Sequence, residues 1–158
     1  MTVRYLVLKE ELREEFEKLE KLFQKILEDR KQYGEIEIYV DAAAMNLQSY
    51  YSGIERMLRA ITVKIDGDTP AGERWHKDLL DQVAIEVPNL RPPVISKTLR
   101  DQLGNYLSFR HVVRNIYPYD LDAEQVEKLL NQLNEVHEGF SKDLHLFLEF
   151  VDRISIDV

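Results

Sequence analysis

One amphipathic pattern runs along almost the whole chain. Apolar residues recur every three or four positions, and charged residues occupy the places between them. This spacing puts the apolar side chains on one face of an α-helix, so each helix must bury that face against another helix. The longest apolar stripe runs from Val126 to Val151. The pattern therefore predicts an all-α protein.

Turn-forming residues divide the first half of the chain into three helices. The first helix is predicted to end near Gly34, and the second covers about 38–65. The glycine- and aspartate-rich segment 66–72 then ends the second helix. Thr69 is expected to cap a short third helix that has Pro70 in its first turn.

Two further helices are predicted in the second half. Three prolines within 86–95 exclude a continuous helix there, so this segment is expected to be a surface connection. Ser96 is a suitable cap for a fourth helix of about 97–116, which Pro118 stops. Asp122 is placed to cap the last helix. The expected architecture is an up-and-down bundle of four long helices and one short helix.

The composition fits one soluble domain. A chain of 158 residues suits a single domain, residues 1–158. It contains no cysteine, which excludes disulfides, thiolate zinc sites and cysteine nucleophiles. The segment from Met1 to Lys9 is too short and too soon charged to be a signal peptide. No apolar run is long enough to cross a bilayer, so we expect a cytoplasmic protein that does not contact membranes.

The charges are distributed unevenly. The net charge is −8, which argues against a protein that coats nucleic acid through its overall charge. The segment 91–118 nevertheless has five basic residues against one acid, whereas ten acids face three basic residues from 119 onward. This basic segment is either an ordinary solvated helix face or a local site for an anion. Its basic residues are Arg91, Lys97, Arg100, Arg110 and Arg114.

Arg110 is the unusual residue of the fourth helix, because it interrupts an otherwise apolar stripe. A guanidinium on such a face is costly unless it is paired or reaches a solvated seam. Arg114 follows four residues later on the same flank, and two such arginines can clamp a phosphate. The alternative is an internal ion pair, with Glu127 or Glu135 of the last helix as the partner of Arg110. Glu55 of the second helix is expected to pair with Arg110 or Arg114.

The four histidines do not have the spacing of a metal site. His137 and His145 are eight residues apart, too far for two ligands on adjacent turns. His76 is expected to be a surface or half-buried hydrogen-bonding residue. His111 follows Arg110 directly and points about 100° away around the helix. We therefore expect neither a metal nor a cofactor.

Three separated segments resemble one family. Residues 109–117 read Phe-Arg-His-Val-Val-Arg-Asn-Ile-Tyr, residues 51–56 read Tyr-Ser-Gly-Ile-Glu-Arg, and residues 72–80 contain a Trp-His pair. Together and in this order they are similar to the HEPN superfamily, in particular to its HepT-like ribonuclease toxins. The resemblance covers about residues 41–150.

The resemblance implies a function, a partner and a set of site residues. Members of the family are two-fold homodimers that cleave RNA, often tRNA, without a metal. Their signature is an arginine, four to six residues, a histidine and then a tyrosine, which correspond here to Arg110, Asn115 and Tyr117. Arg110, His111 and Arg114 would bind the RNA phosphate. The cognate antitoxin is a minimal nucleotidyltransferase that adds AMP to the tyrosine, so Tyr117 is expected to be the modified residue; the alternative is a core tyrosine.

Asn115 stands where the motif has its histidine. RNA transesterification needs a general base and a general acid, and asparagine exchanges no proton near neutral pH. Three interpretations stay open. The chain is an inactive form of the toxin, or a variant that uses His111 or a partner's group, or a non-catalytic dimeric adaptor on the same bundle. If the end of the helix unwinds before Pro118, Asn115 could turn inward toward Arg110.

Overall fold

The computed structural model describes residues 3–156 and contains five α-helices. No strand occurs within this range, so the predicted all-α class is confirmed. None of the described helices is long and apolar enough to cross a membrane. The helices are α1 (Val3–Tyr33), α2 (Ile36–Ile61), α3 (Trp75–Val83), α4 (Lys97–Arg114) and α5 (Ala123–Ile156), with a π-helical turn η1 (Thr62–Asp66) after α2 and a 3₁₀ turn η2 (Pro118–Asp120) before α5.

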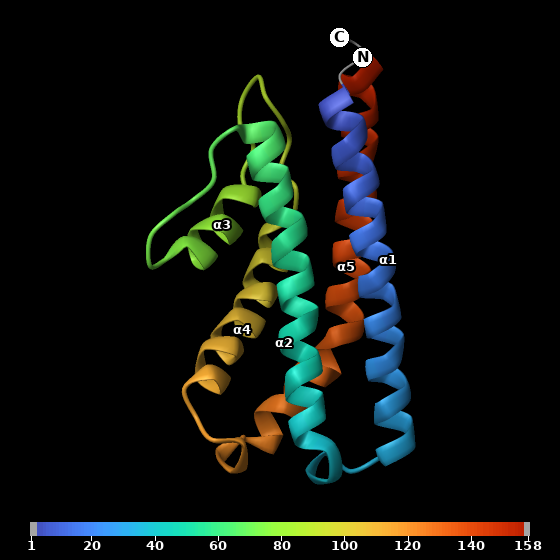
Figure 1. The fold of residues 1–158 in the computed structure, drawn as a ribbon, viewed down its shortest axis with the longest axis vertical. Helices are drawn as coiled ribbons and strands as arrows, with labels where there is room; N and C mark the ends of the chain where they lie inside the picture. Colours follow the sequence, from blue (N-terminus) through green and yellow to red (C-terminus); the bar gives the residue numbers. More distant parts are fainter. Residues whose placement is uncertain (1–2, 157–158) are drawn as a thin grey trace.

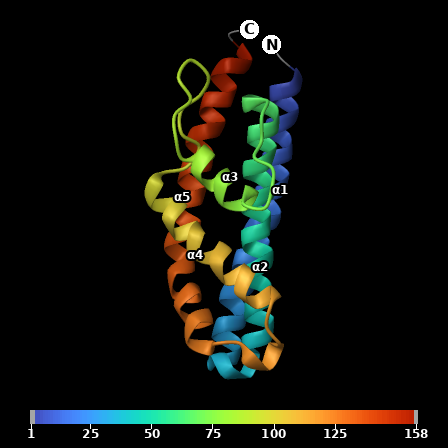
Figure 2. The same ribbon diagram turned by 90° about the vertical axis from the view of Figure 1, so that its left-hand side faces the viewer.

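The long helices form an up-and-down bundle. Helices α1, α2 and α5 lie side by side, and the two chain ends meet at the top of Figure 1. The shorter α3 and α4 cover the other side of α2, and α4 runs obliquely across α2 and α5 in Figure 2. Helix α4 therefore places its C-terminal end near the N-terminal half of α2.

Helix α2 is the central helix, and its buried residues extend over most of its length. It packs closely against α1 at Gly53, where an added Cβ would lie 3.1 Å from Cδ1 of Leu19. That distance is tighter than ordinary van der Waals contact, so a side chain at this position would require the end of the Leu19 side chain to shift by a few tenths of an ångström.

The predicted caps of the two later helices are confirmed. The Ser96 hydroxyl accepts a hydrogen bond from the Leu99 N–H at the start of α4. The Asp122 carboxylate accepts from the N–H of Glu124 at 3.0 Å and of Gln125 at 3.5 Å. As the prolines predicted, residues 86–95 form no helix and α4 stops before Pro118. Helix α4 ends at residue 114, two residues earlier than predicted.

The predicted start of the third helix is wrong. Helix α3 begins at Trp75 instead of near Pro70, and its N-cap Arg74 makes no side-chain capping bond. Thr69 instead accepts a hydrogen bond from the Thr62 hydroxyl at 3.1 Å. The capping signal was misleading because the Thr69 hydroxyl pairs with the Thr62 side chain, and Gly72 with a φ of 95° interrupts any helix there.

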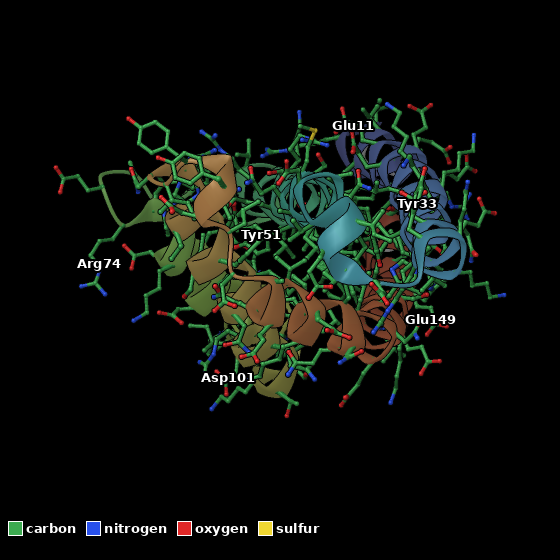
Figure 3. All side chains as sticks on the ribbon, turned by 90° about the horizontal axis from the view of Figure 1, so that it is seen from below. Glu11, Tyr33, Tyr51, Arg74, Asp101 and Glu149 are labelled. Atoms are coloured by element: carbon green, nitrogen blue, oxygen red, sulfur yellow. The ribbon has the colours of Figure 1, made fainter. Side chains whose placement is uncertain are left out.

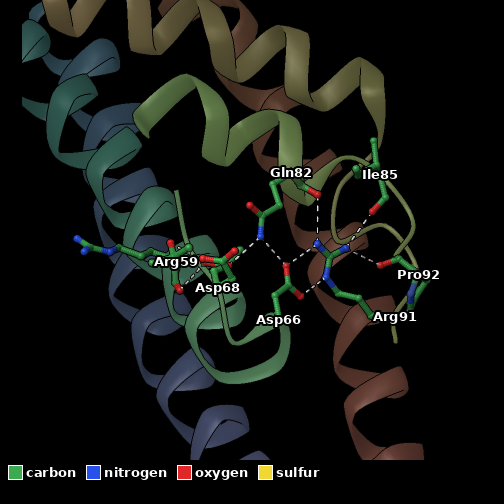
Figure 4. Close-up of polar contacts among 9 residues, drawn as sticks. Arg59, Asp66, Asp68, Gln82, Ile85, Arg91 and Pro92 are labelled. Atoms are coloured by element: carbon green, nitrogen blue, oxygen red, sulfur yellow. Dashed lines mark hydrogen bonds and ion pairs between the residues drawn. The ribbon is translucent and has the colours of Figure 1, made fainter. Parts of the chain in front are cut away.

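A buried ion pair closes the loops at the upper end of the bundle (Figure 4). Nε and Nη2 of Arg91 donate to the two carboxylate oxygens of Asp66 at 2.6 and 2.8 Å. The guanidinium also donates to the carbonyls of Gln82, Ile85 and Pro92. Arg91 thus joins the end of α2 to the connection between α3 and α4. It belongs to the interior and adds no charge to a surface for anions.

Candidate functional site

Arg110 is buried inside the bundle and paired with Glu55. Its side chain projects from α4 toward α2 and the residue keeps only 2% of its surface exposed. Nη1 donates to Oε1 of Glu55 and Nη2 to Oε2, both at 3.2 Å, and Nη1 also donates to the Ser52 hydroxyl at 3.2 Å. The two-pronged contact matches the planar guanidinium to the planar carboxylate. This pairing explains how a charged residue is accommodated on an apolar stripe.

His76 is the third member of this buried cluster. Its Nδ1 lies 2.7 Å from Oε2 of Glu55 and 2.7 Å from Nη2 of Arg110. The imidazole comes from the first turn of α3, so three helices contribute to one charged group. The side chain of His76 keeps 17% of its surface exposed, whereas Arg110 lies behind it. The expectation of a half-buried, hydrogen-bonding histidine is confirmed.

Tyr51 is buried beside this cluster, and Figure 3 labels it in the interior of the bundle, next to α2. Its ring lies 5.0 Å from the guanidinium carbon of Arg110, within the range of a cation–π contact. Burial raises the pKa of the Tyr51 phenol far above its usual range, and the nearby Glu55 carboxylate raises it further. The Tyr51 hydroxyl and Nε of Arg110 are buried without a hydrogen-bond partner in the described part of the chain.

A stack of planar groups leads from the cluster to the surface. The Trp75 ring lies against His76 with the ring centroids 3.7 Å apart. The guanidinium of Arg59 covers Trp75 at 5.0 Å from the ring centroid. On the other side of His76, the exposed His111 contacts it edge to face at a centroid distance of 5.9 Å. His76 is therefore held between α2, α3 and α4.

The C-terminal end of α4 is exposed. His111, Arg114 and Asn115 all lie at the surface. Asn115 is the C-cap residue of α4, and its Nδ2 donates to the His111 carbonyl at 2.8 Å. Tyr117 is 68% exposed and stacks on the ring of Tyr119 at 5.5 Å. The core alternative for Tyr117 is therefore wrong, and so is the expectation that Asn115 turns inward toward Arg110.

Arg110 is not placed to bind the RNA phosphate, which is the role that the resemblance implied for it. A guanidinium that is buried and paired cannot contact an incoming phosphate in this arrangement, because its two terminal nitrogens face Glu55, Ser52 and His76 and its Nε is buried as well. The predicted acidic partners on the last helix are wrong, whereas the prediction for Glu55 is confirmed. Two cations of the basic segment, Arg91 and Arg110, are neutralised internally, which leaves a weaker positive surface than its composition indicates.

His76 was not predicted from the sequence as a member of this site. The signal was present, since His76 and Glu55 lie in two of the three segments that resemble the family. Both are distant in sequence from Arg110, and a helical pattern does not show which faces meet. No group of three potential metal ligands occurs among residues 3–156.

Beside the exposed end of α4 lies an apolar hollow of about 360 Å³. It is formed by one face of α2, including Ala44 and Met45, and by Val113, Ile116 and Leu121 from the end of α4 and the following connection. Met45 is exposed there, as is the neighbouring Val112. The site residues thus border an apolar surface.

Comparison with known proteins identifies the family of the chain. A family model described as HepT-like protein matches residues 42–151, which include all the residues of the buried cluster and the exposed end of α4. The chain belongs to the HepT-like family. No curated protein and no solved structure matches it. In this HepT-like protein, the match runs from within α2 to within α5 and leaves out the whole of α1.

Proposed function

We propose that this HepT-like protein is a metal-independent endoribonuclease of the HEPN toxin type that cleaves tRNA. The observation that supports this best is the exposure of His111, Arg114, Asn115 and Tyr117 together at the C-terminal end of α4, the helix that carries the buried Arg110. Family membership adds the reaction class, and the exposed cation of Arg114 offers a contact for the RNA backbone.

The proposed reaction needs no metal and no oxidant. The 2′-hydroxyl of the RNA loses its proton to a base, and the 2′-oxygen attacks the adjacent phosphorus. The bond from phosphorus to the 5′-oxygen breaks, and an acid protonates that oxygen. The products are a 2′,3′-cyclic phosphate and a 5′-hydroxyl. Asn115 can hydrogen-bond the phosphate, but it can act neither as the base for the 2′-hydroxyl nor as the acid for the 5′-oxygen.

We propose that the enzyme works as a two-fold homodimer. The apolar hollow beside Val113 and the exposed Met45 and Val112 supply a surface that a second copy could cover. A two-fold axis there would bring the ends of both α4 helices together and form one composite cleft. Light scattering should then give twice the mass of 18.7 kDa, and Met45→Glu should give the monomer mass.

We propose that a minimal nucleotidyltransferase antitoxin controls the toxin by adding AMP to Tyr117. Tyr117 is 68% exposed, so its side chain is accessible to a second protein. The bulk and negative charge of AMP beside Arg114 would block access of RNA to the same end of α4.

A second candidate function is a non-catalytic dimeric adaptor. The observation that favours it is the internal pairing of Arg110, which leaves that guanidinium unable to touch a phosphate in this arrangement. Asn115 in place of a proton-exchanging residue points the same way. Under this alternative the same end of α4 binds a protein partner.

Incubation with total tRNA in EDTA separates the two functions. The wild-type chain and Asn115→His are compared, with His145→Gln as a control because His145 is exposed on α5, away from this end of α4. Cleavage by the wild type supports the ribonuclease with another acid–base group. Cleavage by Asn115→His alone identifies a disabled ribonuclease. Cleavage by neither contradicts the proposed ribonuclease and favours the adaptor.

A further inference from the structure

We propose that His76 is the catalytic base of this ribonuclease, with His111 as the acid and Glu55 as the residue that positions His76. This inference rests on the proposed ribonuclease function. It assigns the two proton transfers that Asn115 cannot perform, and it uses a pair of imidazoles that only the tertiary structure brings together.

The contact between His76 and Glu55 has the form of a carboxylate–imidazole dyad. Nδ1 of His76 lies 2.7 Å from Oε2 of Glu55, and the carboxylate is buried and further held by both terminal nitrogens of Arg110. A carboxylate in this position holds the imidazole in one tautomer and stabilises it when it gains a proton. Glu55 is therefore a positioning residue, and Arg110 positions Glu55 in turn.

The buried carboxylate selects the tautomer of His76. Nδ1 is also 2.7 Å from Nη2 of Arg110, so it is close to one acceptor and one donor. If Nδ1 carried a lone pair, two acceptors would face each other in a buried site. A proton on Nδ1 instead gives the charged carboxylate another donor, which is the stronger interaction. Nη2 of Arg110 is then a second donor 2.7 Å from that N–H, and it directs its own hydrogen bond to Oε2 of Glu55. Nε2 then carries the lone pair and makes no hydrogen bond with the described residues.

The residues packed against His76 hold its ring close to the surface. Trp75 packs against the ring of His76, and the guanidinium of Arg59 lies 5.0 Å from the centroid of the Trp75 ring, which restricts rotation of the imidazole. The His76 side chain keeps 17% of its surface exposed, and its ring lies edge to face with the exposed His111 at a centroid distance of 5.9 Å. A phosphodiester would approach the two rings from solvent.

The two histidines complete the proton balance of the reaction. Nε2 of His76 accepts the proton of the 2′-hydroxyl, and the imidazolium of His111 gives a proton to the leaving 5′-oxygen. The 2′-oxygen-to-phosphorus bond forms as the bond to the 5′-oxygen breaks. Proton exchange with water afterwards restores the neutral His76 and the protonated His111.

The test compares tRNA cleavage by the full chain and by His76→Gln, His111→Gln and the control His145→Gln in EDTA. Loss of a general acid or base lowers the rate roughly 10²–10⁴-fold, so we expect this loss for the first two variants and wild-type activity for the control. The wild type should show a bell-shaped pH profile. His76→Gln should lose the acidic limb, and His111→Gln should lose the alkaline limb.

Glu55→Gln tests positioning separately from simple packing. It keeps the shape of the side chain but removes its charge, so slower cleavage and loss of the fixed Nδ1–H tautomer of His76 are expected. Circular dichroism establishes that each variant is folded. If His76→Gln destabilises the chain, His111→Gln at the exposed ring still tests the pair.

The outcomes distinguish the inference from the function on which it rests. If neither the wild type nor Asn115→His cuts RNA at any pH, the proposed ribonuclease is contradicted. Cleavage by Asn115→His alone keeps the ribonuclease and overturns the assignment of His76 and His111. A cutting wild type together with an equally active, folded His76→Gln overturns the assignment of His76 and leaves the ribonuclease intact. Two-bond ¹H–¹⁵N spectra give a readout without activity: the Nδ1–H tautomer of His76 is expected, and the Nε2–H tautomer overturns the assignment.

Discussion

Arg110 and Glu55 form a two-pronged ion pair across the bundle, with both guanidinium–carboxylate contacts at 3.2 Å. The two residues are 55 positions apart and belong to different helices. Both are buried, so the pair lies in a region where an unpartnered charge is expensive. His76 joins them from a third helix.

Removal of Glu55 should destabilise the fold. Glu55→Ala leaves Arg110 buried and unpaired, for which a cost of about 3–5 kcal/mol is expected. Urea unfolding monitored by circular dichroism measures this loss. The matched control is Glu15→Ala, whose partner Arg56 is exposed and 3.7 Å away, and which should cost about 0–1 kcal/mol. Equal costs for the two variants would contradict a buried, energetically coupled pair.

The buried Arg91–Asp66 pair should be equally sensitive. Arg91→Ala removes five hydrogen bonds and leaves a buried carboxylate, so a loss of about 3–5 kcal/mol is expected. In a domain of this size that corresponds to a melting temperature lower by about 6–20 °C. Arg100→Ala is the control, because its partner Asp101 is exposed. An unchanged melting temperature for Arg91→Ala would show that the loops do not depend on this pair.

Alkaline pH should unfold the protein through its buried tyrosines. Burial raises the pKa of Tyr50, Tyr51 and Tyr106 well above the ordinary value of 10. Above that value the unfolded chain releases phenolic protons that the folded chain keeps, so stability falls as pH rises. The slope is about 1.4 kcal/mol per pH unit for each group. Urea unfolding at pH 8 to 11.5 should show the loss, and Tyr106→Phe should reduce the slope. A stability independent of pH above 10 would contradict the prediction.

Tyr117 should be the acceptor of AMP. Incubation with the cognate nucleotidyltransferase and ATP should raise the mass of the chain by one AMP, and Tyr117→Phe should abolish the gain. Tyr119→Phe is the matched control, since Tyr119 is 81% exposed and stacks directly on Tyr117. If the mass gain persists in Tyr117→Phe, a different hydroxyl is the target. Intact-mass spectrometry makes this measurement.

Capping residues correctly predicted the starts of α4 and α5 but not the start of α3. Ser96 and Asp122 cap their helices because a short oxygen-bearing side chain can reach N–H groups two or three residues ahead. Thr69 has the same chemistry, yet its hydroxyl bonds Thr62 at the end of the preceding helix. A capping residue next to two helix ends is ambiguous until the path of the loop is known.

The sequence by itself determined the all-α class, most helix boundaries and the family, because helical periodicity and short capping motifs are properties of neighbouring residues. It also pointed to the stretch from Arg110 to Tyr117. Only the tertiary structure decided that Arg110 faces Glu55 and His76 instead of solvent. Periodicity assigns a residue to a face of its own helix, but the partner of that face depends on how the helices cross, and that is settled by packing over the whole bundle.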